Sequence, residues 1–317
     1  MKKRIITGII FFAVLVPLIV VDFLLPAFQI VCGLLACIGA WEMLRLYGKE
    51  KRYPIIVQII IIFSTLLVFC AGLTLWTPFE GDIMLNPDSP NIIGYLFDAK
   101  LSFALLILSI VTQLSLLVFY KNFDARDIGK SIATSFYVGF GMAALSTLRL
   151  MGIRYIVYLF MITWLTDVFA FFFGILFGKH KMIERISPKK TWEGAIGGTI
   201  VATLTATLFA FLYGKLFVGD LLNPQGLNTI FDTVTTGTTQ ANPVLLFIVI
   251  FIVTLCTSIA GQLGDLIASR LKRTYEIKDF SNIFPGHGGV LDRFDSSIFA
   301  SMVLLALLLI VSGIYIL

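Results

Sequence analysis

The sequence predicts an all-α integral membrane protein with about nine transmembrane helices. Of its 317 residues, 58% are hydrophobic and only 14% are charged, and the mean hydropathy is +0.95. The apolar residues form several runs of about 20, which is the length that an α-helix needs to cross a bilayer. This composition excludes a water-soluble globule. We expect the lipid bilayer as a partner and no nucleic acid.

The apolar runs set the expected order of the helices. In chain order, the predicted spans are 5–22, 24–46, 54–76, 100–120, 130–149, 154–177, 194–216, 243–266 and 297–316. The first five form a predicted N-terminal region, residues 1–150, and the others form a C-terminal catalytic region, residues 151–317. The polar residues of chemical interest all lie in the second region. The segment 217–242, rich in Thr, Asn and Gly, is expected to be an exposed connector.

Lysine and arginine are sorted between alternate loops. If the N-terminus lies inside, all of the 24 basic residues except Lys100, Arg149, Arg154 and Lys215 fall on the cytoplasmic side. The positive-inside rule then predicts a cytoplasmic N-terminus and an outer C-terminus. We expect a multi-pass protein of a bacterial cytoplasmic membrane.

The few cysteines and histidines of the chain bear on which metal sites and disulfides it can form. The four cysteines all fall in apolar spans without a Cys-x-x-Cys pair, so neither a zinc site nor a disulfide framework is indicated. Only two histidines occur, which excludes a His-rich metal site.

Three aspartates are expected at one membrane face. Asp265 follows Gly261-x-x-Gly264 near the end of the eighth span, and Asp292 and Asp295 open the ninth. A carboxylate in mid-bilayer costs roughly 2.5–3.5 kcal/mol, whereas the glycines allow close helix approach. Taken singly, the acids are explained by an ion pair with a neighbour such as Arg270 or by the helix dipole. Together, they supply the hard oxygen ligands that Mg²⁺ prefers.

Two further segments are candidate phosphate sites. In Pro285–Gly289, the glycines Gly286, Gly288 and Gly289 leave backbone N–H groups free to cradle an anion. His287 in this segment is either a phosphate donor or a hydrogen-bonded loop residue. Before the seventh span, Ser187 and Pro188 are expected as N-cap and first helical residue, which puts Lys189 and Lys190 at a positive helix end. A positive-inside flank explains the same composition.

Other polar residues lie inside the spans. Asp167, in the sixth span, is the deepest acid, and such residues usually face a cavity or a partner. Gly174-x-x-x-Gly178 is one residue too short for a phosphate-binding loop, so we interpret it as a packing face of small residues. Glu42 and Arg45 share a helix face, and we interpret them as an interfacial charge pair.

These motifs together resemble a known family. Ser269-x-Leu-Lys272-Arg273, Lys278-Asp279 and His287-Gly-Gly-Val-x-Asp292-Arg293-Phe-Asp295 are similar, in order and spacing, to the C-terminal signature of the phosphatidate cytidylyltransferase (CDP-diacylglycerol synthase) family. Residues 186–194 and the stretch from Asp167 to Lys179 look like the same family. The similarity covers residues 167–198 and 261–296, whereas the first half matches only as generic membrane helices.

The resemblance implies a reaction and roles for named residues. CMP would pass from CTP to phosphatidate, giving CDP-diacylglycerol and pyrophosphate for phospholipid biosynthesis, with one or two Mg²⁺ ions at a cytoplasmic site. Asp265 and Asp292, with Asp295 assisting, would hold the metal. The other implied catalytic residues are Lys272, Arg273, Lys278 and Arg293, and the implied substrate contacts are Asp167, Ser187, Lys189, Lys190, Ser269, Gly286, His287, Gly288 and Gly289. A homodimer is also suggested.

Two other functions are compatible with the composition. A CTP-dependent polyprenol kinase would transfer the γ-phosphate and release CDP. An ion-coupled transporter would use Asp167 and Asp265 as relay sites within the membrane. The one-sided placement of the basic and glycine-rich segments argues against the transporter. Composition does not separate the kinase from the cytidylyltransferase, and only the order of the motifs favours the latter.

Overall fold

The structure is almost entirely helical in the residues that it describes. This computed structural model describes residues 8, 13–75, 99–218, 223, 226–235, 237–284, 286 and 288–313. Within these residues, eight helices are long and apolar enough to cross a membrane. Part of the predicted first span lies outside the described residues, and its residues 13–20 are helical. The all-α membrane class is therefore confirmed for this part of the chain, with one two-stranded hairpin added.

The chain divides into two compact units, which are described separately below. The first unit holds the described residues up to 150 together with 271–294. The second holds 151–270 and the described residues from 295 onward. Two helices, α11 (Pro243–Thr274) and α12 (Leu291–Gly313), therefore contribute residues to both units.

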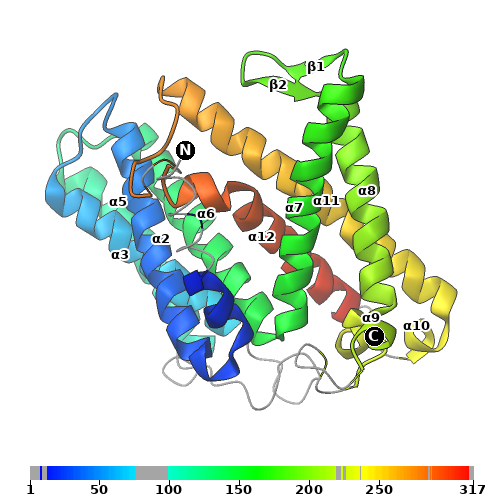
Figure 1. Ribbon diagram of the computed structural model, residues 1–317. Helices are drawn as coiled ribbons and strands as arrows, with labels where there is room; N and C mark the ends of the chain where they lie inside the picture. The colour runs from blue at the N-terminus through cyan, green and yellow to red at the C-terminus, as the bar shows by residue number, and fades with distance from the viewer. Residues whose placement is uncertain are drawn as a thin grey trace. The chain divides into compact units, whose positions relative to one another are not determined.

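Four long helices build most of the first unit. They are α2 (Leu25–Tyr47), α3 (Ile55–Leu75), α5 (Ala99–Phe119) and α6 (Ala125–Leu150), preceded by the short 3₁₀ helix η1 (Asp22–Leu24). Helix α3 packs against α5 and α6, and α2 packs against α3 and α6 (Figure 1). Pro26 stands in the first turn of α2, where the missing N–H of proline removes no helical hydrogen bond. The apolar runs thus become helices at nearly the predicted bounds.

A buried acid joins the loop after α2 to the start of α6. Asp127 is only 2% exposed, and its carboxylate accepts hydrogen bonds from Lys51, from the Tyr53 hydroxyl at 2.8 Å and from the Asp124 N–H at 3.0 Å. Burial raises the pKa of the Tyr53 hydroxyl, and Asp127 raises it further, so this group stays protonated and donates. The buried Asp127 carboxylate therefore has hydrogen-bond donors on both of its oxygens, and these bonds attach the loop to α6.

The second unit is built around a pair of adjacent helices. Helix α7 (Ile153–Phe177) and helix α8 (Trp192–Phe211) lie side by side and are joined by the strands β1 (Lys181–Ile183) and β2 (Ser187–Thr191) (Figure 1). The strands pair antiparallel, with Lys181 opposite Thr191. The short elements α9 (Tyr213–Leu216), η2 (Ile230–Thr233) and α10 (Gly237–Ala241) follow before α11.

The prediction that Ser187 is the N-cap of the helix in the seventh span is wrong. Ser187 belongs to strand β2, and the N-cap of α8 is Thr191, whose Oγ1 accepts a hydrogen bond from the Gly194 N–H at 3.2 Å. The fixed φ of Pro188 suits an extended strand as well as a first helical turn, so pairing with β1 decides between them. Lys189 and Lys190 consequently lie on a strand rather than at a helix end.

The segment 217–242 is also more than an exposed connector in its described part. Ile230 and Phe231 in η2 are fully buried, and Phe231 packs edge-on against Tyr158 with ring centroids 6.0 Å apart. The Thr233 hydroxyl accepts a hydrogen bond from Arg154 at 2.9 Å. The polar composition of this segment conceals these two apolar anchors, which pack it against α7.

Glycines allow the helices of the second unit to approach closely. A Cβ atom at Gly198 would lie 2.6 Å from the Thr166 carbonyl oxygen, and one at Gly194 would lie 2.6 Å from that of Ala170. Gly174 and Gly178, on the other side of this contact, face Thr191, which confirms the predicted packing face. Small residues of this kind replace the hydrophobic driving force that is missing between helices in lipid.

Helices α11 and α12 meet in the same way within the second unit. A Cβ atom at Gly264 would lie 2.7 Å from the Asp295 carbonyl oxygen and 2.8 Å from the Phe299 Cβ. This contact confirms the predicted role of the glycine before Asp265. Because α12 begins at Leu291, the prediction that Asp292 lies in its first turn is also confirmed.

We predict that Gly198→Ala lowers the melting temperature of the purified protein in detergent. The added methyl group would press on backbone atoms of α7, which cannot rotate away, and overpacking of this kind costs about 1–3 kcal/mol. The matched control is Gly129→Ala in α6, where nothing lies within 4 Å of the new Cβ. There the better helix propensity of alanine should leave the melting temperature unchanged or raise it. Equal melting temperatures for the two variants would contradict the close contact.

Candidate functional site

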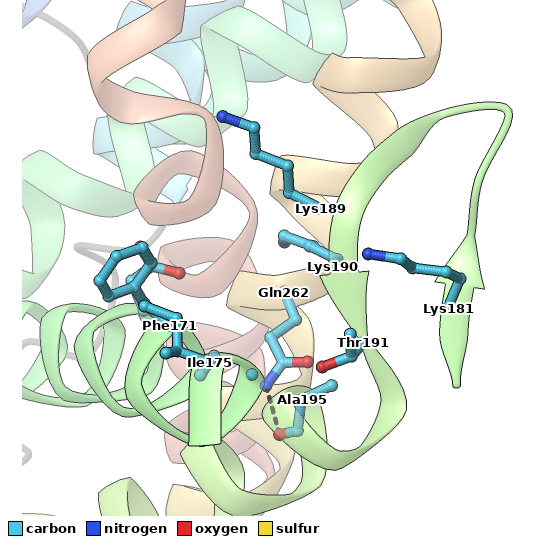
Figure 2. A pocket seen from close by; sticks show the side chains of 11 residues that line it. Phe171, Ile175, Lys181, Lys189, Lys190, Thr191, Ala195 and Gln262 are labelled. Carbon is cyan, nitrogen blue, oxygen red and sulfur yellow. Dashed lines mark hydrogen bonds between the residues drawn. The ribbon is translucent and has the colours of Figure 1, made fainter. Parts of the chain in front are cut away.

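A pocket of about 400 Å³ opens in the second unit between α7, the hairpin, α8 and α11 (Figure 2). Its lining residues are Asp167, Ala170, Phe171, Gly174, Ile175, Lys181, Lys189, Lys190, Thr191, Ala195 and Gln262. Lys181 and Lys190 reach over the pocket from the two strands of the hairpin (Figure 2). The pocket thus combines three lysines with a carboxylate and an amide, and it brings together the predicted site residues Asp167, Lys189 and Lys190.

An ion pair links the hairpin to α11. Lys190 pairs with the Asp265 carboxylate, and the side chains are 27% and 29% exposed, respectively. Asp167 lies near enough to both groups to interact with them electrostatically. On the next turn of α11, the Ser269 hydroxyl donates a 3.4 Å hydrogen bond to Asp265. The structure therefore brings four predicted residues together, namely Asp167, Lys190, Asp265 and Ser269.

Gln262 lines the pocket. The sequence did not predict it as a site residue. Its Nε2 donates to the Ala195 carbonyl oxygen at 3.0 Å and to the Thr199 hydroxyl at 2.8 Å, so it ties α11 to α8. Figure 2 shows the first of these bonds as a dashed line. A lone amide between Gly261 and Gly264 in an apolar run was the available signal, since an unsatisfied amide is costly inside a membrane protein.

Glu193 fixes the hairpin that carries the lysines. Its carboxylate accepts hydrogen bonds from the backbone N–H groups of Lys179 and His180, each at 3.2 Å, and lies 2.6 Å from His180 Nδ1. The Trp192 N–H donates to the His180 carbonyl oxygen at 3.0 Å. An acid in the first turn of α8 also suits the helix dipole. The start of α8 thereby holds the chain that leads into β1.

One wall of the pocket is apolar and open. Phe171 and Ile175 both line it, and each is 65% exposed. Large apolar side chains that are exposed on a membrane-spanning helix face lipid or a ligand. A pocket with lysines on one side and exposed apolar side chains on another suits an amphipathic molecule with a phosphate group.

The first unit holds a second cluster, centred on Asp292. Its Oδ1 accepts a 2.9 Å hydrogen bond from Lys272, and its Oδ2 accepts from the N–H groups of Phe280 at 2.8 Å and Gly289 at 2.9 Å. The Asp292 side chain is only 4% exposed. Gly288, with φ of 84°, adopts a left-handed conformation that brings its Cα against this carboxylate. The Gly289 N–H is therefore already bonded, so an anion held by the glycine segment would compete with Asp292 for it.

The remaining predicted residues lie in less connected places. Arg273, Lys278, Gly286 and Arg293 are exposed in the first unit, and Asp295 belongs to the second unit at its contact with Gly264. Ser187 pairs with Ile183 in the hairpin, and His287 lies outside the described residues. The structure thus gathers some of the predicted residues in two clusters, one in each unit, and places the others outside these clusters.

Comparison with known proteins decides the family. A family model described as "Cytidylyltransferase family" matches residues 2–311. The chain belongs to this family. It is 31% identical to a phosphatidate cytidylyltransferase of Bacillus subtilis over 98% of this chain and 99% of the relative. It is 32% identical to one of Staphylococcus haemolyticus over the same shares, and 40% identical to one of Staphylococcus aureus over 63% of this chain and 66% of the relative.

The two clusters suit the chemistry of a cytidylyltransferase. Such an enzyme must bring two phosphate groups together, and their negative charges repel one another. Lys181, Lys189 and Lys190 supply positive charge in the pocket, whereas Asp167 and Asp265 can hold a cation there. Lys272 brings a further positive charge to the signature segment.

Proposed function

We propose that the chain transfers CMP from CTP to phosphatidate, which yields CDP-diacylglycerol and pyrophosphate. The observation that carries this proposal is the match over nearly the whole length of both chains to enzymes named phosphatidate cytidylyltransferase. In the reaction, a phosphate oxygen of phosphatidate attacks the α-phosphorus of CTP, and the bond to the β-phosphate breaks. Because phosphatidate is already an anionic nucleophile, no covalent intermediate with the enzyme is needed.

The residues of this chain then act mainly by position and charge, as in other phosphoryl transfers. Lys189 and Lys190 bind a phosphate group of a substrate in the pocket of the second unit. Phe171 and Ile175 form an apolar wall of that pocket, and the acyl chains of phosphatidate pack against it. Lys272, Arg273, Lys278 and Arg293 bind the phosphates of CTP.

Magnesium belongs to this proposal, and the residues fit it in part. One carboxylate oxygen of Asp265 already forms an ion pair with the Lys190 ammonium, so this carboxylate can face a cation. The side chain is also partly exposed to solvent, which suits a magnesium ligand. Among the described residues, no three or more His, Cys, Asp or Glu side chains cluster as a metal site. Mg²⁺ takes only one or two carboxylates and completes its shell with water and substrate phosphates. Within the second unit, Asp265 would hold it, with Asp295 assisting, and the ion would offset charge on the phosphate oxygens.

The orientation in the membrane is also a proposal, supported by the distribution of lysine and arginine. We place the N-terminus and the catalytic residues on the cytoplasmic side, where CTP is available, and the C-terminus outside. A homodimer stays a prediction of the family resemblance.

Labelled CTP tests the reaction directly. Purified protein in detergent–lipid micelles with phosphatidate and Mg²⁺ should move label from the α-phosphate of CTP into lipid, and γ label should appear in pyrophosphate. Label from the γ-phosphate in lipid would instead mean a CTP-dependent lipid kinase. If lipid and Mg²⁺ cause no turnover of either label, an ion-coupled transporter becomes the better explanation.

Asp265→Asn tests the metal assignment. The amide keeps the shape but loses the charge, so we expect label transfer to fall by roughly 100-fold or more, the usual effect of removing one electrostatic contact at the reacting phosphates. The Mg²⁺ concentration for half-maximal activity should rise, as a Mg²⁺ titration would show. Glu184→Gln changes an exposed acid between β1 and β2, and as the control it should leave both values unchanged. An Asp265→Asn enzyme with a normal Mg²⁺ response would remove Asp265 from the metal site.

Reporter fusions at the C-terminus test the orientation. Alkaline phosphatase is active only outside the cytoplasm and green fluorescent protein is fluorescent only inside it. We therefore expect an active phosphatase fusion and a dark fluorescent fusion after residue 317. An inactive phosphatase fusion with a fluorescent fusion would place the C-terminus in the cytoplasm and contradict the predicted orientation.

A further inference from the structure

Among the described residues of the first unit, the most deeply buried acid lies far from the signature motifs in sequence. Glu42, in the last third of α2, is 0% exposed. The structure shows that its interpretation as an interfacial pair with Arg45 is wrong. Arg45 is exposed and lies over the Trp41 ring at 5.7 Å, and no ion pair joins it to Glu42 within the described residues. A carboxylate sealed inside a membrane protein needs other partners.

The partners of Glu42 all belong to the segment that joins α11 to α12. Its Oε1 accepts hydrogen bonds from the Ser281 hydroxyl at 2.5 Å and from the Val290 N–H at 2.9 Å. Its Oε2 accepts one from the Leu291 N–H at 2.8 Å. Leu291 is the first residue of α12, where backbone N–H groups have no partner within the helix. Glu42 therefore caps α12 from another helix, and each of its oxygens serves a different N–H group.

Glycines make room for this carboxylate. A Cβ atom at Gly289 would lie 2.2 Å from Glu42 Oε1 and 2.7 Å from the Ser281 hydroxyl oxygen. One turn before Glu42, a Cβ atom at Gly39 would lie 3.2 Å from the Leu291 side chain. The glycine at 289 is thus explained by the acid that faces it, independently of any ligand.

The same segment is held from its other side by Asp292. The Asp292 carboxylate accepts hydrogen bonds from the N–H groups of Phe280 and Gly289 and from Lys272. The N–H of Gly289 therefore goes to Asp292, and that of the next residue, Val290, goes to Glu42. Two carboxylates with adjacent donors fix one stretch of backbone, so a shift at one of them moves the other.

We propose that Glu42 is a positioning residue for cytidylyl transfer, which sets Asp292 and Lys272 by holding the backbone of Ser281, Val290 and Leu291. It acts through these residues, because its own side chain has no exposed surface with which to touch a substrate. The kinetic part of this inference rests on the proposed function, whereas the structural part does not.

Hydrogen–deuterium exchange on Glu42→Gln tests the structural part. Glutamine has one acceptor oxygen where two are used, so its NH₂ group would face either the Val290 or the Leu291 N–H. We expect peptides that cover residues 288–294 to exchange at least about tenfold faster, while peptides from α5 and α6 exchange as in the wild type. Arg45→Gln, on the same helix but exposed, is the matched control and should change neither. Unchanged exchange at 288–294 in Glu42→Gln would overturn the proposal.

Steady-state kinetics test the functional part. Transfer of α label by Glu42→Gln should show kcat/KM reduced by roughly 10- to 100-fold, the range typical of residues that orient the groups of a site, with a raised KM for CTP. A merely structural role would lower only the folded fraction, so the apparent kcat would fall while KM stayed the same. That pattern, or normal kinetics in a variant with faster exchange, would contradict positioning.

Ser281→Ala covers the case in which Glu42→Gln does not fold. This variant removes one donor and leaves both N–H bonds of Glu42, so smaller changes of the same two kinds are expected at 288–294 and in KM. No change in either quantity would count against the proposal. If the wild-type protein moved no α label at all, the proposed function would fail while the exchange experiment still decided the role of Glu42.

Discussion

The first unit depends on the Glu42 carboxylate and the backbone N–H groups that it meets at the start of α12. In water, a lost hydrogen bond is replaced by one to solvent, but no water is available at a position with no exposed surface. The carboxylate and the N–H groups would then both be left unsatisfied, which costs about 1–3 kcal/mol for each neutral group and more for a charge. The order of the backbone at 289–291 follows from this requirement, because the same stretch also provides a donor of Asp292.

The two lysine–aspartate pairs differ in how readily they can open. Lys190 and Asp265 are each more than a quarter exposed, and a pair of this kind contributes only about 0–1 kcal/mol to stability. Separating these two side chains therefore costs little. Lys272 and Asp292 are only 13% and 4% exposed, so separating them would leave a poorly hydrated charge. The first pair can therefore open more readily than the second.

The sequence predicted most of the fold and part of the site, for different physical reasons. Apolar runs of bilayer length identify membrane helices because each span must satisfy its backbone by itself. The roles of Gly264 and Gly178 in packing were predictable since small residues allow helices to approach. Ser187 was misplaced because proline suits both a first helical turn and a strand, and only pairing with β1 decides between them. Glu42 was misassigned because its nearest basic residue in sequence is not its partner in space.

The contact between Glu42 and Val290 also bears on how the protein is made. The ribosome synthesises Val290 248 residues after Glu42, when almost the whole chain has been translated. Until then, α2 carries an acid whose donors do not yet exist, and loops this long close late. A nascent chain that stops within α11 would lack all three donors that bond Glu42 in the structure. The buried carboxylate of α2 thus gains its partners only after the C-terminal segment has been made.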